Sequence, residues 1–382
     1  MMSPADATLP DSPAGRLREE VRVVANADTP VRALAAVVCF EPDRQHLTEL
    51  AERLRDCPLE SLLLVDNSET EAGRASVRAV AQAYELRLVA SPRNVGVAEA
   101  QNIALRVARE AGCTHALLLD QDSLLDRAAI ARLIDAYQVL LAGGERVAAV
   151  GPALFDPRCE TTLPFVRLGR LRMRKLASSP GQLIDCDLLI SSGCLLSMDA
   201  VDEVGEMDRT FFIDYVDFEW CTRAKSLGYK VFGVGDALMT HTIGDKTIKV
   251  MGRVIALHNP IRNYYAIRNA ILFARKPYLS WRWRAHLAYR AAGQFVLFTF
   301  LCPQPWRRMG WMLRGAWHGL TGRGGRLGGD AGLGEAGRSR PALASALPRT
   351  LTADLSDPSQ AGVRGPMRAS EPVASSMRAR LR

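Results

Sequence analysis

The stretch HALLLDQDS, residues 115–123, decides the fold because it joins an apolar run to a pair of carboxylates. Ala116 to Leu119 form a continuous apolar run, which is typical of a strand buried on both faces of a parallel α/β sheet. Asp120 and Asp122 follow at the carboxyl end of this strand, where open α/β sheets bind their ligands. Alternate side chains of an extended chain share a face, so both carboxylates can point into one crevice.

The pair Asp120 and Asp122 has two interpretations. Two like charges held so close repel, and a hard divalent cation between carboxylates and phosphate oxygens relieves that repulsion. An isolated Asp-x-Asp is also often a polar turn at a strand end with no ligand. The prediction of a site for Mg²⁺ or Mn²⁺ therefore depends on the features that accompany the pair.

Strand and helix signals alternate from about Arg32 to Pro152. This alternation predicts a doubly wound, mostly parallel sheet. Residues 153–184 are irregular and basic and give no pattern. Beyond them a helix is expected to end near Leu227 and a strand to cover 231–234. Within the alternating region, the predicted strands are 35–40, 61–65, 86–90, 116–119 and 147–150, and the predicted helices are 47–55, 73–84, 98–111 and 127–141.

Composition divides the 382 residues into four parts. Residues 1–31 are rich in Pro, Asp and Ala without an apolar block, which predicts a disordered N-terminus and no secretory signal. Residues 32–258 carry the alternation, 259–320 form a basic helical appendage, and 321–382 are a Gly-, Arg-, Ser- and Pro-rich tail that we expect to be disordered. The eight cysteines lack metal-type or redox-type pairs, which favours reduced thiols in a cytoplasmic protein.

The net charge of +8 conceals an asymmetry, since residues 246–329 contain fifteen Lys or Arg and no Asp or Glu. A basic block on an acidic remainder suggests a polyanionic partner for the block alone. Its apolar run from Ala291 to Leu301 is shorter than the roughly 20 residues that span a bilayer, but Trp and Arg around it suit a helix lying in an anionic membrane surface. Packing on the domain or on a partner subunit of a homo-oligomer is the alternative. No recognised motif supports nucleic acid.

Polar residues also follow other predicted strands. Asp66 and Asn67 end the second strand, and a carboxylate there can accept a hydrogen bond from the N3–H of uracil or thymine. An Asx-turn or a helix N-cap explains them equally well. Asn94, Gly96 and Asn102 surround a predicted helix start, which can bind an anion with its amides and dipole. Small residues there also suit helix–sheet packing.

Asp217 is the candidate for the chemistry. The aromatic approach around Phe211 and Tyr215 excludes water and raises the pKa of a carboxyl, whereas a helix N-terminus favours the ionised form. Asp214 and Glu219 are competitors, and any of the three can simply stabilise the first turn of the helix. His241, on a polar turn after an apolar strand, is a candidate imidazole ligand beside Asp122, although a lone His is more often structural.

Taken in order, these segments resemble the inverting glycosyltransferases of family two, and among them the bacterial rhamnosyltransferases. The most specific pieces are 118–123, the block from Phe211 to Arg223, and HTIGD at 241–245. The resemblance implies the GT-A type of α/β fold, a Rossmann-like and mostly parallel sheet flanked by helices, with a C-terminal helical, basic amphipathic appendage.

The resemblance also implies roles for the candidate residues. Asp217 matches the general base that takes the proton of the acceptor hydroxyl. Asp122 and His241 would hold Mg²⁺ or Mn²⁺ on the diphosphate. Two departures stand out, since Val216 occupies a position where many relatives have Glu, and Glu41 one where Asn is common. The residues that would bind the nucleotide sugar are Phe40, Glu41, Asp66, Asn67, Asn94, Gly96, Asn102, Asp120 and Gln121.

These implications predict a metal-dependent glycosyltransferase that moves L-rhamnose from dTDP-L-rhamnose. Its acceptor would be a cell-surface polysaccharide of the O-antigen kind or a polyprenyl-diphosphate-linked glycan, at the inner face of the cytoplasmic membrane. A sugar-phosphate nucleotidyltransferase is one alternative, but it would normally carry a Gly-rich basic loop after the first strand, where FEPD at 40–43 is acidic. A non-catalytic, membrane-associated sugar-nucleotide-binding protein is another, and the full set of candidate Asp and His residues argues against it.

Overall fold

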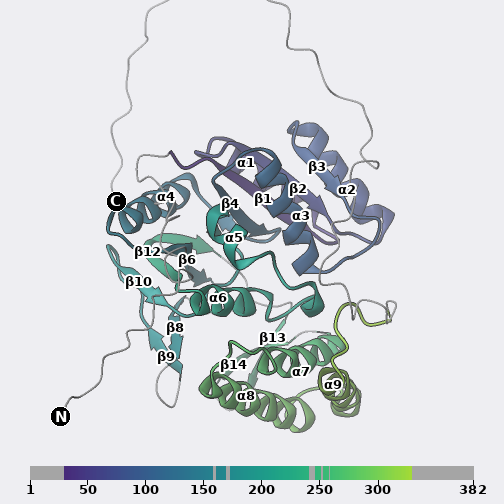
Figure 1. Cartoon of the computed structure of the whole chain (residues 1–382). Helices are drawn as coiled ribbons and strands as arrows, with labels where there is room; N and C mark the ends of the chain where they lie inside the picture. Colours follow the sequence, from purple (N-terminus) through teal and green to yellow (C-terminus); the bar gives the residue numbers. More distant parts are fainter. Residues whose placement is uncertain are drawn as a thin grey trace, which may run out of the picture. The chain divides into compact units, whose positions relative to one another are not determined.

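The computed structural model describes residues 30–157, 161–168, 173–240, 246–250, 253–257 and 259–328 (Figure 1). All of them belong to the first of two units, residues 1–335, whereas the second unit, 336–382, lies outside the described residues. Of the segments expected to be disordered, 1–31 and 321–382, the parts 1–29 and 329–382 fall outside them, as does the proposed ligand His241, whereas residues 321–328 of the expected tail are described and packed.

A ten-stranded sheet forms the centre of the described unit. Its main path runs β10-β12-β6-β11-β4-β1-β2-β3, with β5 paired to β12 and β7 paired to β6. Two separate hairpins consist of β8 with β9 and of β13 with β14. The strands are β1 Ala33–Cys39, β2 Ser61–Asp66, β3 Arg87–Ala90, β4 His115–Asp120, β5 Leu124–Leu125, β6 Val147–Asp156, β7 Thr161–Leu163, β8 Phe165–Leu168, β9 Met173–Leu176, β10 Leu183–Cys186, β11 Cys194–Ser197, β12 Lys230–Thr240, β13 Lys246–Val250 and β14 Arg253–Leu257.

The predicted helices and strands of the alternating region are all present, most of them close to their predicted bounds, but the strand predicted at 147–150 extends to Asp156. Side-chain caps start several helices, such as Asp43 at α1, Thr70 at α2 and Asp126 at α4. The helices are α1 Arg44–Arg55, α2 Glu71–Ala83, α3 Val97–Glu110, α4 Arg127–Ala142, α5 Met198–Val204, the 3₁₀ turn η2 Arg209–Phe211, α6 Val216–Ser226, α7 Pro260–Ala274, α8 Trp281–Phe300 and α9 Pro305–Leu320.

The sheet is mixed, with the predicted parallel arrangement in two parts that antiparallel strands join and flank. β4, β1, β2 and β3 are parallel neighbours, and β12 is parallel to β6. β11, however, lies antiparallel between β4 and β6, and β10 pairs antiparallel with β12. The patternless residues 153–184 contain the end of β6, the start of β10 and the strands β7 to β9, which at three or four residues each are too short to show the periodicity that marks a strand.

The prediction of strands buried on both faces is confirmed. Along β1, Leu34, Ala36 and Val38 join one apolar cluster, whereas the alternate residues Ala35 and Val37 join another. Helices α3, α5 and α6 contribute to the first cluster, and α1, α2 and α4 contribute to the second. The prediction of an α/β fold with helices on both faces of the sheet is therefore confirmed.

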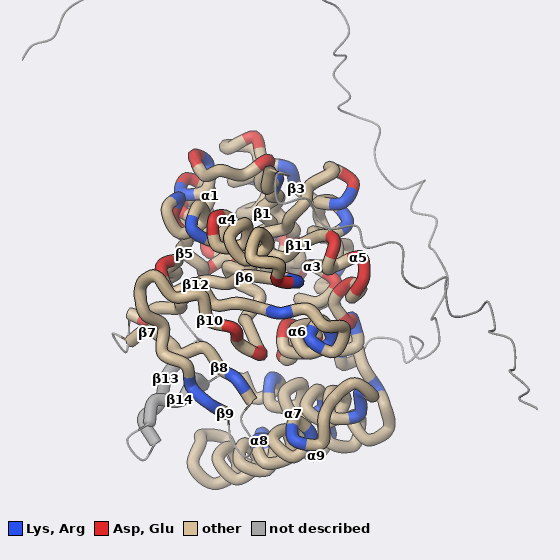
Figure 2. Tube along the Cα trace, turned by 60° about the vertical axis from the view of Figure 1, so that its left-hand side comes forward, with Lys and Arg blue, Asp and Glu red and all other residues tan. Residues whose placement is uncertain are grey.

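Helices α7, α8 and α9 pack on one another next to α6 and η2 (Figures 1 and 2). Ile267, Phe298 and Met312, one from each helix, share a small apolar cluster. A Cβ on Gly315 would lie 2.4 Å from the carbonyl oxygen of Tyr264, so glycine is needed for the close approach of α9 to α7. Among the described residues, the helices all fall short of the length and hydropathy that crossing a membrane requires.

Candidate active site

The carboxyl ends of β1, β2 and β4 lie side by side at one edge of the sheet. The register pairs Cys39 with Asp66 and Val38 with Asp120. A cavity of about 790 Å³ opens at this edge, between the strand ends, α6, α7 and α8. This is the edge where open α/β sheets bind ligands, and where the sequence predicts the site.

Gln121 fastens β4 to the end of β1. Its Oε1 accepts from the backbone N–H of Phe40 at 2.7 Å, and its Nε2 donates to the carbonyl of Phe40 at 3.1 Å. Both residues line the cavity, and 43% of Phe40 is exposed. The two hydrogen bonds therefore fix the backbone of a residue whose aromatic ring stays accessible.

Asn67 and Asn94 form a second pair on the cavity wall. The Nδ2 of Asn67 donates to the Oδ1 of Asn94 at 3.0 Å, and the Oδ1 of Asn67 accepts from the N–H of Val95 at 2.8 Å. Gly96 follows at φ +87°, and a Cβ there would lie 2.5 Å from the ring of Phe212 and 2.6 Å from its carbonyl oxygen. Glycine is thus required where the start of α3 meets the segment that leads into α6.

Three of the predicted nucleotide-sugar residues do not line the cavity. Asp66 is 1% exposed and accepts from the N–H of Ser68 at 2.9 Å, which is the Asx-turn alternative. Asn102 is buried and exchanges hydrogen bonds with the backbone of Met207 at 2.9 and 2.8 Å.

The third is Glu41, whose carboxylate accepts from Thr70 Oγ1 and from the N–H groups of Glu69 and Thr70 at 2.8 Å each. These hydrogen bonds, that of the Thr70 hydroxyl first, lower the pKa of Glu41. The position of all three residues supports a structural role, because their polar atoms hold neighbouring backbone.

Asp217 lies in the first turn of α6 and lines the cavity. Its carboxylate accepts from the N–H of Phe218 at 2.9 Å and of Ser191 at 3.2 Å. Burial raises the pKa of Asp217 to about 6, and the charge of Asp120 adds to this effect, while the backbone donors oppose it. The sequence left open whether burial or the helix N-terminus dominates the pKa of Asp217. Burial has the larger effect, so the pKa is raised.

The two competitors of Asp217 have other partners. Asp214 forms an ion pair with Arg262 at 2.9 Å. Glu219 is 1% exposed and bonds to Arg223 at 2.9 Å and to the hydroxyl of Tyr278. Among these three carboxylates, Asp217 is the one that lines the cavity without an ion-pair partner in the described part of the chain.

The backbone before α6 is strained. Phe212, Asp214 and Tyr215 have φ values of +61°, +65° and +66°, which cost about 1–3 kcal/mol each for residues with side chains. Asn269 of α7, fully buried, donates to the carbonyls of residues 211, 213 and 214 at 2.8, 2.6 and 3.0 Å. Arg268 beside it donates to the carbonyls of residues 210 and 211 at 3.2 and 3.0 Å. These two side chains hold the segment that aims Asp217.

Helices α7 and α8 supply a wall of the cavity that the sequence did not predict. Arg262, Asn263 and Ala266 come from α7, and Arg290, Gln294, Leu297 and Phe298 come from α8. Residues three and four apart share one face of a helix, and the polar Arg290 and Gln294 within a largely apolar helix are the signal that could have revealed this wall.

Two buried oxygens on this wall have no hydrogen-bond partner among the described residues. They are the hydroxyl of Tyr215 and the Oε1 of Gln294. Burial raises the pKa of the Tyr215 hydroxyl, and the charge of Arg290 opposes that rise. Buried polar atoms are normally satisfied, whereas these two oxygens, in residues that line the cavity, are not satisfied by any of the described residues.

Asp120 and Asp122 differ in position. Asp120 lines the cavity, and its N–H donates to Ser192 Oγ at 3.0 Å. Asp122 lies in the exposed turn after β4 and is not part of the lining. Among the described residues, which exclude His241, no three potential metal ligands gather. The pair still fits Mg²⁺ or Mn²⁺, because such a cation is usually held by one or two carboxylates together with substrate phosphates.

The segment after α9 returns to the cavity region. The N–H of Gly325 donates to the carbonyl of Thr210 at 2.7 Å, and the N–H of Leu327 donates to the hydroxyl of Tyr265 at 3.0 Å. Between them, Arg326 pairs with Glu69 at 2.5 Å and donates to the carbonyl of Asn94 at 3.4 Å. We call residues 324–327 the strap, because they join α7 to the loops after β2 and β3.

Comparisons with known proteins show what this chain is similar to. No protein-family model matches the chain. dTDP-rhamnosyl transferase RfbF of Shigella flexneri is 33% identical over 244 residues, which are 63% of this chain and 79% of that protein. The structure of S. aureus TarS 1–349 in complex with UDP-GlcNAc is similar in fold, with a TM-score of 0.50 and 13% identity over 77% of this chain and 82% of that one. The mannosyltransferase PcManGT from Pyrobaculum calidifontis, in complex with GDP-Man and Mn²⁺, gives a TM-score of 0.47 at 14% identity, over 77% of this chain and 88% of that one.

Proposed function

This chain belongs to the glycosyltransferases of the GT-A fold, the family of its Shigella flexneri relative. We propose that it transfers L-rhamnose from dTDP-L-rhamnose to a saccharide hydroxyl. The observation that carries the proposal is that Asp120 and Asp217, which are far apart in the chain, line one cavity at the carboxyl edge of the sheet. The relative's name supports the choice of donor.

Asp217 acts as the general base. A carboxyl with a pKa of about 6 is ionised at neutral pH and is a stronger base than an ordinary Asp. The N–H groups of Ser191 and Phe218 fix the direction of the carboxylate. As the acceptor hydroxyl loses its proton to Asp217, its oxygen bonds to the anomeric carbon and the bond to the nucleoside diphosphate breaks. A single displacement from the opposite face inverts the anomeric configuration.

The donor occupies the strand-end side of the cavity. Phe40 offers an accessible ring to the pyrimidine, and Gln121, Asn67, Asn94 and Gly96 surround it on the same wall. Asp122, with Asp120 beside it, and His241 would hold the divalent cation, which when bound stabilises the negative charge of the departing diphosphate as a Lewis acid.

The acceptor occupies the α7–α8 side of the cavity. The unpartnered oxygens of Tyr215 and Gln294 accept hydrogen bonds from sugar hydroxyls, and Arg290 beside them attracts an anionic group. This combination suits a glycan linked to a polyprenyl diphosphate or a growing cell-surface polysaccharide of the O-antigen kind.

A panel of nucleotide sugars tests the donor. With Mn²⁺ present, dTDP-rhamnose at a hundred times its dissociation constant should stabilise the folded chain by about 2.7 kcal/mol, measured as a rise in melting temperature. GDP-mannose serves as the purine control and should give no rise. Removal of the cation by a chelator should reduce the effect of dTDP-rhamnose. Absence of stabilisation by any pyrimidine nucleotide would refute the proposal.

Assays of the same protein distinguish the proposed transferase from a nucleotidyltransferase and from a non-catalytic binding protein. A nucleotidyltransferase would release pyrophosphate from dTTP and rhamnose 1-phosphate, and a pure binder would be stabilised by the donor without releasing dTDP in the presence of any acceptor. We expect dTDP release that depends on acceptor and no pyrophosphate.

The activity should depend on pH through Asp217. The ionised carboxylate is the base, so kcat/KM should fall about tenfold for each pH unit below about 6 and level off above it. Initial rates measured over this range check the result. A bound cation near Asp120 would shift the fall in kcat/KM to lower pH, because it cancels part of the negative charge that raises the pKa of Asp217. A plateau that extends unchanged below pH 4 would contradict the assignment of Asp217.

A further inference from the structure

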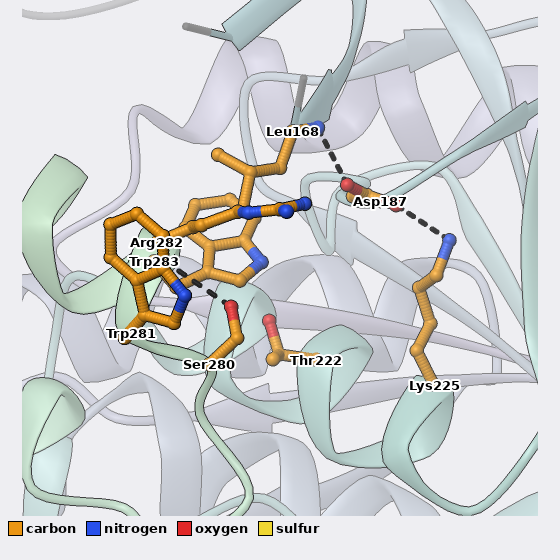
Figure 3. A pocket seen from close by; sticks show the side chains of 8 residues that line it. All are labelled: Leu168, Asp187, Thr222, Lys225, Ser280, Trp281, Arg282 and Trp283. Carbon is orange, nitrogen blue, oxygen red and sulfur yellow. Dashed lines mark hydrogen bonds and ion pairs between the residues drawn. The ribbon is translucent and has the colours of Figure 1, made fainter. Parts of the chain in front are cut away.

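Helix α8 presents a continuous apolar face to solvent. Trp281, Tyr289, Val296 and Phe300 are 70%, 78%, 54% and 73% exposed. They are separated by eight, seven and four residues, so they share one side of the helix. Figure 3 shows the start of this helix, where Ser280 caps it and Trp281, Arg282 and Trp283 border a smaller pocket of about 300 Å³.

Helix α9 has the same property. Trp306, Leu313, Trp317 and Leu320 are 77%, 54%, 62% and 65% exposed, at separations of seven, four and three residues. The buried residues of α9, such as Met312, lie on its other side and pack toward α7 and α8. Ordinary surfaces carry scattered apolar residues, but two helices with large aromatic side chains aligned on their exposed sides mark an interaction site.

The surroundings of these faces are basic. Residues 259–328 contain Lys and Arg but no Asp or Glu, and Figure 2 shows the corresponding blue segments along α7, α8 and α9. Arg307 and Arg314 are exposed and adjoin the apolar face of α9. Arg282 lies over the ring of Trp281, with 5.9 Å between its guanidinium carbon and the ring centroid. The combination of exposed Trp and Tyr with Arg is typical of helices at a membrane–water interface.

We propose that the apolar faces of α8 and α9 dock on the anionic surface of a lipid bilayer, at the depth of the headgroups and without crossing it. Charge complementarity favours lipid over a second copy of the chain. Two copies would bring together surfaces with an excess of Lys and Arg and no carboxylates, whereas an anionic leaflet neutralises them.

The docking places the cavity next to the bilayer. On α8, Arg290, Gln294, Leu297 and Phe298 line the cavity, at positions roughly opposite to the exposed face on the helix. One helix therefore separates the lipid from the acceptor side of the cavity. This arrangement gives a polyprenyl-linked acceptor at the cytoplasmic face a short path to Asp217. The path of the acceptor rests on the proposed function, whereas the docking itself does not.

Flotation of the full chain with vesicles tests the proposal. We expect binding to vesicles of phosphatidylglycerol and phosphatidylcholine and little binding to phosphatidylcholine alone. The variant Phe300→Ser/Trp306→Ser/Trp317→Ser should lower the partition coefficient at least about tenfold. Arg307→Gln/Arg314→Gln should lower it about fivefold per substitution, since each cation near an anionic leaflet contributes roughly 1 kcal/mol.

The matched control is Val139→Ser/Leu238→Ser, which removes apolar side chains that are 63% and 49% exposed on α4 and β12. It should bind vesicles like the parent. The triple variant should keep the parent's melting temperature and its activity on a water-soluble acceptor, so that loss of docking is distinguishable from loss of catalysis. The proposal is overturned if the parent does not bind anionic vesicles, if the triple variant binds equally well, or if the substitutions dissociate a dimer and leave vesicle binding unchanged.

Discussion

Asp217→Asn is expected to lower kcat by about a thousandfold while the affinity for the nucleotide sugar stays unchanged, because general-base catalysis contributes about 10²–10⁴. The substitution keeps the size of the side chain and one acceptor for the N–H groups of Ser191 and Phe218, but it removes the base. Single-turnover transfer and donor binding by calorimetry provide the two measurements.

The stability of this variant separates lost chemistry from lost folding. Asp217 has a pKa of about 6 when folded and about 3.9 when unfolded, so the folded state loses stability as pH rises between these values. Asn cannot ionise, so the variant avoids this loss of stability, which is at most about 3 kcal/mol. The gain offsets the one hydrogen bond from a backbone N–H that Asn cannot accept. The melting temperature at neutral pH should therefore stay near or above that of the parent.

Asp214→Asn is the matched control. Asp214 lines the same cavity and tolerates Asn at its positive φ, but its carboxylate is paired with Arg262. We expect a much smaller loss of kcat. An equal loss in both variants, or an Asp217→Asn enzyme that keeps most of its rate, would show that another group takes the proton.

Asn269→Leu should both destabilise the chain and slow catalysis. The change keeps a similar volume but removes the Asn269 donor from the carbonyls of residues 213 and 214, while the carbonyl of residue 211 keeps its hydrogen bond from Arg268. Each unsatisfied buried group costs about 1–3 kcal/mol, so for the two carbonyls we expect a loss of about 2–4 kcal/mol after partial relaxation. Chemical denaturation measures it.

The kinetic signature identifies Asn269 as a positioning residue. Release of the strained segment around Tyr215 should let Asp217 drift, so kcat should fall at temperatures where the variant is still folded, with little change in KM for the donor. Asn259→Ala is the control, since Asn259 caps α7 and its loss should cost about 1 kcal/mol with kcat unchanged. A parental kcat in folded Asn269→Leu would contradict this role.

Local patterns were sufficient to predict the first half of the fold and the edge that holds the site. The apolar run of β4 and the carboxylate at its end are encoded in consecutive residues, so Asp120 was found directly. The antiparallel position of β11 between β4 and β6 could not be predicted in this way, because it depends on packing between segments that are distant in the sequence. The strands β7 to β9 have only three or four residues each, so they carry no periodicity that a sequence pattern can detect.

The roles of individual polar residues were the least predictable. Glu41, Asp66 and Asn102 have the right chemistry for a ligand, yet backbone groups bind them, in the local turn to Ser68 for Asp66 and from distant segments for the other two. The sequence cannot show which of two partners a carboxylate or amide will meet. The same limit hid Arg268 and Asn269, whose importance arises from the backbone of residues 210–214 that they bind.

The strap has a practical consequence for protein engineering. Helical periodicity ends at Leu320, so an expression boundary drawn from the sequence would fall there. A chain cut at that point would lack the contacts of Gly325 with Thr210 and of Arg326 with Glu69, which brace the approach to Asp217 and the loop after β2, on the proposed nucleotide side of the cavity. The shortest piece worth producing therefore ends after Leu327, and an affinity tag belongs beyond it.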